Sequence, residues 1–61
     1  MSYQRYQVTL MFGGDDCPQL PDRDFVVTSQ GVESAVKVAI YDAIDLGYKR
    51  GWVIGHTVEL L

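Results

Sequence analysis

An apolar residue occupies every second position near the start of the chain: Tyr6, Val8, Leu10 and Phe12. The positions between them are polar or less apolar. Side chains of a strand point alternately to its two faces, so a period of two predicts a strand with one buried face. We therefore expect a strand over residues 3–12.

A loop and a second strand are predicted next. Residues 13–23 contain two Gly, two Pro and three Asp, a composition typical of a loop. This loop is long for a hairpin, and long loops are often functional or mobile. Residues 24–29 form a run of β-branched side chains that predicts a short strand, with Phe25 and Val27 facing the core.

Residues 32–46 carry apolar side chains at helical spacing. The stripe comprises Val32, Ala35, Val36, Ala39, Ile40, Ala43, Ile44 and Leu46. Three alanines recur every four residues, which predicts a small ridge that lets the helix lie close to a sheet. The hydroxyl of Thr28 or Ser29 is expected to cap the helix start, and Gly47 to supply the left-handed residue after its end.

A basic turn at residues 48–51 leads into a third predicted strand, residues 52–61. Alternate positions predict one buried face, made of Trp52, Ile54, His56, Val58 and Leu60. Gly55 is a candidate bulge that would shift the register beyond it.

The order of elements predicts an α+β fold, β-β-α-β, in a single domain of residues 1–61. Its three-stranded, antiparallel-containing sheet would carry one helix on one face, with the first strand in the middle. So small a domain buries a limited core. One cysteine and one histidine exclude an internal disulfide and disfavour a zinc site, so we expect self-association, as a dimer, to extend the core.

The sheet face without a helix is the first candidate contact surface. It should carry Tyr3, Arg5, Gln7, Thr9, Met11, Val26, Thr28, Val53, Thr57 and Glu59. This mixture is apolar enough to meet a partner or a second copy, although single exposed apolar residues are normal. The unpaired sheet edges are a second route to association.

Charge and hydropathy narrow the function classes. The net charge is -3, which disfavours duplex nucleic acid as a ligand. No apolar run approaches the roughly 20 residues that span a bilayer, and residues 1–5 lack the apolar core of a signal peptide. A single unpaired cysteine fits a reducing compartment, so we expect a cytoplasmic protein without a membrane partner.

The candidate chemistry is sparse. Asp15, Asp16 and Asp22 form an acidic loop that suits a cation or a protein partner, or that is simply solvated. His56 and Cys17 share no motif that pairs a base with a nucleophile. The Gly13-Gly14 pair lacks the Lys-Ser/Thr ending of a phosphate loop. We therefore expect no enzyme, no cofactor and no metal.

Two further clusters are candidate contacts. Val38, Tyr41 and Asp45 lie off the buried stripe of the helix, and Tyr is enriched in interface hot spots; incidental exposure is the alternative. Lys49, Arg50 and Trp52 combine charge with an aromatic ring, which suits stacking on a base and contacting phosphate. Basic residues after a helix also complement its dipole.

The strands and the helix together resemble small accessory proteins of phages and mobile elements, some of which inhibit bacterial defence systems as anti-CRISPR proteins do. The segments that carry the resemblance are residues 6–10 (YQVTL), 25–29 (FVVTS), 33–39 (ESAVKVA) and 46–48 (LGY). The resemblance implies a protein-binding module that regulates or inhibits a host protein, and it assigns no residue a role. The alternative is a small nucleic-acid-binding protein that uses the basic turn.

Overall fold

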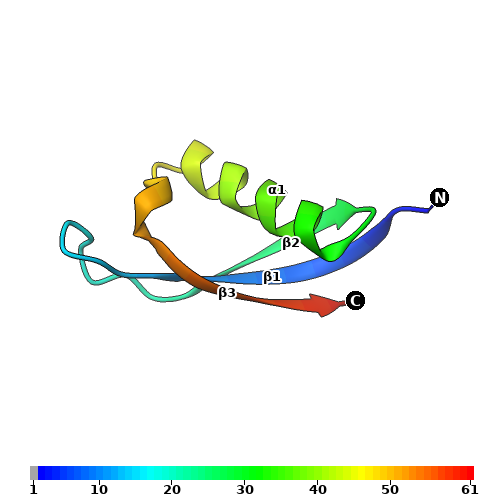
Figure 1. Cartoon of the computed structure of the whole chain (residues 1–61), viewed down its shortest axis with the longest axis horizontal. Coiled ribbons are helices and arrows are strands. Elements are labelled where there is room, and N and C mark those ends of the chain that lie inside the picture. Colours follow the sequence, from blue (N-terminus) through cyan, green and yellow to red (C-terminus); the bar gives the residue numbers. More distant parts are fainter. Residues whose placement is uncertain (1) are drawn as a thin grey trace.

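A three-stranded sheet and one helix make up the computed structural model, which describes residues 2–61 (Figure 1). The elements are β1 (Gln4–Phe12), β2 (Arg23–Ser29), α1 (Val32–Asp45), a 3-10 turn η1 (Arg50–Trp52) and β3 (Val53–Leu60). The predicted β-β-α-β order is confirmed. No helix within the described residues has the length and apolarity to cross a membrane.

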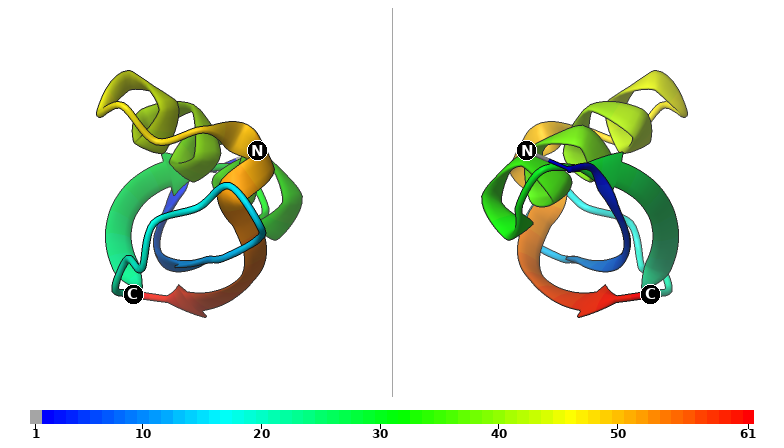
Figure 2. Two further views of the ribbon diagram at one scale, coloured as in Figure 1. Left: turned by 90° about the vertical axis from the view of Figure 1, so that its left-hand side faces the viewer. Right: turned by 90° about the vertical axis from the view of Figure 1, so that its right-hand side faces the viewer.

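The sheet has the strand order β2-β1-β3, and both pairs are antiparallel. β1 lies in the middle, as its regular alternation predicted. Seen end-on, the sheet curls strongly and α1 lies across its concave side (Figure 2). The molecule is elongated, with extents of 40 × 18 × 15 Å.

The core lies between the concave side of the sheet and α1. Its buried apolar members are Tyr6, Val8, Leu10, Phe12, Phe25, Val27, Ala35, Ala39 and Ala43. The predicted inward faces of β1 and β2 are therefore confirmed. Among the described residues, Val8 and Leu10 are the large side chains that are completely buried, which makes the core small.

α1 contacts the sheet through its alanines, and this leaves much of its apolar stripe uncovered. Ala35, Ala39 and Ala43 are buried, whereas Val36 and Ile40 are half-buried. The prediction that the whole stripe is buried was wrong for three residues, Val32, Ile44 and Leu46, which are exposed. The reason is the position of the helix on the sheet, since α1 lies mainly over β2 and β1 and, of the three strands, contacts β3 least.

The start of α1 differs from the prediction and its end agrees with it. The N-cap residue is Gly31, without a side-chain cap, and the buried Ser29 hydroxyl donates a hydrogen bond to the Gly31 carbonyl instead (3.1 Å). At the other end Gly47 has a φ of 105°, and its N–H donates to the Ile44 carbonyl (2.9 Å). The N–H of Tyr48 donates to the Ala43 carbonyl (3.1 Å), which completes a Schellman motif.

Replacing Gly47 by alanine should lower the free energy of unfolding by about 1 kcal/mol, because a Cβ makes positive φ unfavourable. Urea unfolding followed by Trp52 fluorescence measures this. The matched control is Gly51→Ala, since Gly51 has no positive φ and a Cβ there would meet nothing within 4 Å. Equal stability of the two variants would contradict the assignment of Gly47 as a required left-handed residue.

β3 contains a bulge at Ile54. Phe12 lies opposite Val53, while Met11, the preceding residue of β1, lies opposite Gly55, so Ile54 is the extra residue. Val53 consequently packs against the core, and its predicted place on the open face was wrong. Ile54, predicted to be buried, is 67% exposed. The bulge precedes Gly55, so His56, Val58 and Leu60 keep the predicted helix-side face.

The loop between β1 and β2 is held at several points. It covers residues 13–22, since Arg23 already belongs to β2. The N–H of Gly13 donates to the Trp52 carbonyl (2.8 Å), and the side chains of Cys17 and Leu20 pack against the core. The acidic tip is thus carried on an anchored loop.

Candidate functional site: a groove beside an edge strand

The open face of the sheet is largely polar and carries side-chain hydrogen bonds between β1 and β2. The Asp24 carboxylate accepts hydrogen bonds from the Thr9 hydroxyl (2.6 Å) and the Gln7 amide (3.3 Å). Met11 is half-buried and lies over Gly55. Tyr3, Arg5 and Val26 are exposed. An antiparallel sheet can face water on one side, and this face is built in that way.

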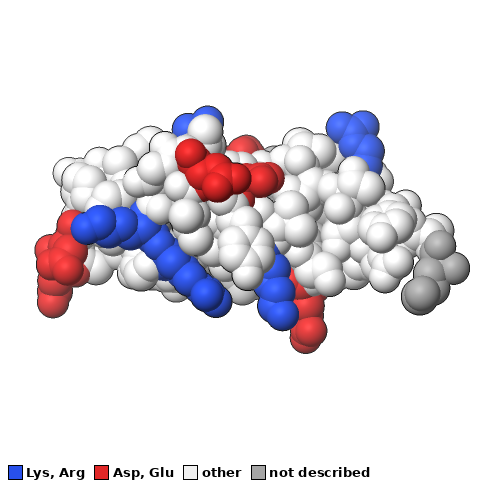
Figure 3. Space-filling view, turned by 90° about the horizontal axis from the view of Figure 1, so that it is seen from above, with Lys and Arg blue, Asp and Glu red and all other residues white. Residues whose placement is uncertain are grey.

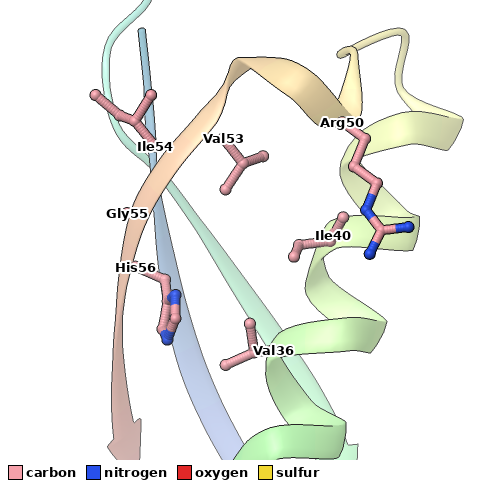
Figure 4. A pocket seen from close by; sticks show the side chains of 7 residues that line it. All are labelled: Val36, Ile40, Arg50, Val53, Ile54, Gly55 and His56. Atoms are coloured by element: carbon pink, nitrogen blue, oxygen red, sulfur yellow. The ribbon is translucent and has the colours of Figure 1, made fainter.

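A hollow lies on the other side of the sheet, between α1 and β3. Val36 and Ile40 of α1 face Val53 and His56 of β3 across it, and Arg50 extends alongside Ile40 (Figure 4). Its volume is about 520 Å³. Ile54 points away from the helix (Figure 4).

A second hollow of about 270 Å³ continues the first toward the start of α1. The two share Val36 and His56, and the second adds Val32, Glu33 and Lys37. We call the two together the α1–β3 groove. The groove exists because the alanine ridge holds α1 over β2 and β1, so that the flank of the apolar stripe overhangs an uncovered strand.

The groove runs beside an unpaired strand edge. β3 is the last strand of the sheet, and its sequence contains no Lys or Pro that would hinder pairing. The N–H of Leu61 donates to the Arg5 carbonyl (3.0 Å), which shows that this residue directs its backbone groups toward β1. Successive residues of a strand direct their N–H and C=O groups alternately to one side of the strand and to the other.

The alternate directions of the backbone groups along β3 determine which of its N–H and C=O groups are free. His56, Val58 and Leu60 direct their N–H and C=O groups to the free edge, because Leu61 and every second residue before it face β1. The side chains of the same three residues lie on the helix side, opposite Leu10, Val8 and Tyr6. Free hydrogen-bonding groups and an apolar groove therefore occur together.

Basic side chains border the groove. Seen from the helix side, Lys and Arg residues lie at both long edges of the molecule, with acidic residues beside some of them (Figure 3). Lys37 and Arg50 line the groove, and with Ile40 and Tyr41 they also line a hollow of about 190 Å³. The side-chain hydrogen bonds within residues 2–61 involve neither cation.

The acidic loop lies at the far end of the molecule. Asp15, Asp16 and Asp22 are exposed, and the first two line a hollow of about 220 Å³ with Lys49 and Trp52. Within residues 2–61, no three His, Cys, Asp or Glu side chains come together as metal ligands. The loop therefore presents carboxylates to solvent.

The other predicted contacts are spread over the surface. Val38, Tyr41 and Asp45 are exposed on α1, where Tyr41 borders the groove. Trp52 is half-buried against the core, and the ammonium of Lys49 lies 5.7 Å from the centre of its ring. The indole Nε1 is buried with no hydrogen-bond partner in the described part of the chain. Little of this ring remains free to stack on a base.

The sequence prediction missed the groove. The apolar stripe of eight residues on the helix was recognised, but its spacing does not show which strand lies below each flank. His56 was placed on the inward register of β3, which is correct, but the residue is exposed since α1 does not reach over it. No family model matches this chain, and no curated protein or solved structure matches it significantly.

Proposed function

We propose that this chain is a small non-enzymatic protein-binding module that accepts an extended polypeptide strand along β3 and in the α1–β3 groove. One observation carries the proposal. The free backbone groups of His56, Val58 and Leu60 lie beside a groove lined by apolar side chains of α1. Strand addition uses this combination, with main-chain hydrogen bonds for affinity and side-chain pockets for specificity.

The charges around the groove favour a polypeptide ligand and indicate which side chains it brings to the groove. Lys37 and Arg50 border the groove of a chain whose net charge is -3. These cations disfavour a strand that brings basic side chains to the groove, and the apolar lining favours a strand that brings apolar side chains into it. A nucleic acid would instead need a broad basic face with free aromatic rings, whereas Trp52 is half-buried.

The sharper version of the proposal is a phage or mobile-element regulator that inhibits a host or defence protein. This version rests on the resemblance of the strand and helix pattern. Restored plating of a phage on a host that carries the defence system would support it. Unchanged plating on every host with a defence system would contradict this version and would not affect the general proposal of a binding module.

A substitution at His56 tests the groove directly. His56→Pro removes an N–H that points to the free edge, and the preceding Gly55 accommodates a proline. His56→Thr is the matched control, because it also removes the imidazole and keeps the N–H. We expect the immobilised parent chain and His56→Thr to retain a bacterial protein. His56→Pro should retain about tenfold less of it.

The other outcomes of this experiment are equally informative. Equal retention by the parent and by His56→Pro would place the binding surface elsewhere and overturn the proposal. Retention that falls steeply with salt and disappears after nuclease treatment would favour the nucleic-acid alternative.

A further inference from the structure

We propose that the strand accepted by the α1–β3 groove is β3 of a second copy of this chain, and that Leu60 of each copy enters the groove of the other. This inference rests on the proposed function, since it names the occupant of the same surface. It would make a continuous six-stranded sheet from two three-stranded ones.

The free edge of β3 suits pairing with itself. An isologous dimer brings the same patch of both copies together, so two β3 strands related by a two-fold axis are antiparallel. The outward N–H and C=O groups of His56 and Val58 then meet those of the second copy. No charged side chain lies on the helix side of the paired strands, where the facing residues are His56, Val58 and Leu60.

A two-fold axis at Thr57 gives a consistent register. Residues directly opposite in an antiparallel pair share a face, so the axis must pass beside a residue and not between two. At Thr57 it pairs His56 with Val58 of the second copy, and Thr57 with itself on the open face, which is a favourable cross-strand pair. An axis at His56 would instead oppose two imidazoles, and an axis at Glu59 two carboxylates.

This register connects an exposed side chain with the groove. Leu60 of the second copy comes opposite Ile54, where the bulge turns Val53 inward, and its side chain lies on the helix side. Val53, Ile40 and the stem of Arg50 line the groove at this point. Leu60 is 57% exposed in a single chain. One contact, made twice by symmetry, therefore covers an exposed leucine and fills a groove.

The surface of the chain has room for a dimer interface, since its accessible area is 4314 Å². A stable dimer buries about 800 Å² on each copy, roughly a fifth of this surface. β3 has eight residues and extends about 26 Å, so the edge and the groove together offer a long strip for that contact.

Light scattering across a concentration series tests the proposal with three variants. The parent should be a dimer at micromolar concentration. Leu60→Lys and His56→Pro should each raise the dimer dissociation constant at least about tenfold. Leu46→Lys is the matched control, because Leu46 is 55% exposed and lies at the end of α1. It should leave the dissociation constant unchanged.

Amide exchange of the parent chain gives a second readout that does not depend on a variant folding. Dimerisation through β3 should slow the exchange of the amides of His56, Val58 and Leu60 as the concentration rises. The amides of Thr57 and Glu59 already face β1 and should change little. This alternating pattern would not arise from a dimer that forms through the open face of the sheet.

Three results would overturn the proposal. A parent that is monomeric at every concentration excludes the dimer. A dimer that both Leu60→Lys and His56→Pro leave intact forms through another surface, and so does a dimer without the alternating exchange pattern. If the parent is monomeric but still captures a protein in a manner that His56→Pro abolishes, the second copy is the wrong occupant and the binding module stands.

Discussion

A Leu10→Ala variant is expected to lose about 3–5 kcal/mol of its free energy of unfolding, because it removes a completely buried side chain and leaves a cavity. Leu10 lies in the central strand, with Arg23 of β2 and His56 of β3 opposite. A domain of 61 residues has about 3–9 kcal/mol in total. The loss is therefore about a third or more of its stability.

Urea unfolding followed by circular dichroism measures this loss, at one fixed protein concentration, since association would shift the midpoint. Val26→Ala is the control, because Val26 lies on the neighbouring strand and is 53% exposed. It should change the free energy of unfolding by less than about 0.5 kcal/mol. A Leu10→Ala variant within 1 kcal/mol of the parent would mean that the core is not centred on this residue.

An Ala39→Leu variant should lose about 1–3 kcal/mol, because the larger side chain has no room between α1 and the sheet. Ala39 is completely buried at the middle of the alanine ridge. Leucine has a helix propensity close to that of alanine, so the helix itself is not the cause of the loss. The effect tests how closely α1 approaches the sheet.

The comparison for this variant is Val38→Leu, one residue earlier on the exposed side of α1. It should cost less than about 0.5 kcal/mol. Thermal unfolding followed by circular dichroism distinguishes the two. If both variants were equally stable, α1 would pack loosely on the sheet and the alanines would have no role in spacing.

The strands and the helix were predictable because they depend on local patterns. Tyr6, Val8 and Leu10 alternate without interruption, so their burial followed from the period of a strand. The end of α1 followed from Gly47, since a left-handed residue after a helix is a local requirement. The central place of β1 was inferred from its length and regularity, and the pairing agrees.

The groove was not predictable in the same way, because it depends on where α1 lies over the sheet. The spacing of Val32, Val36 and Ile40 shows that they share one flank of the helix with the alanines, but it does not show which strand lies below. Similarly, Gly55 signalled a bulge in β3, whereas the pairing with Met11 and Phe12 shows that the extra residue is Ile54. Both outcomes depend on contacts between segments distant in the chain.

The predicted cap of α1 failed for a related reason. Ser29 is a suitable N-cap residue by type, but it is the last residue of β2 and its side chain is buried against the core. Because Ser29 belongs to β2, its hydroxyl does not cap α1. Gly31 starts the helix in its place, with an extended backbone.

Because of the bulge at Ile54, the effect of deleting one residue of β3 depends on which residue is removed. Ile54 has no partner in β1, so a length variant that lacks one residue there would restore regular pairing and keep His56, Val58 and Leu60 on the helix side. A variant that lacks Thr57 would move every later residue to the opposite face. A three-nucleotide deletion in the gene would therefore be nearly silent at one codon and disruptive three codons later.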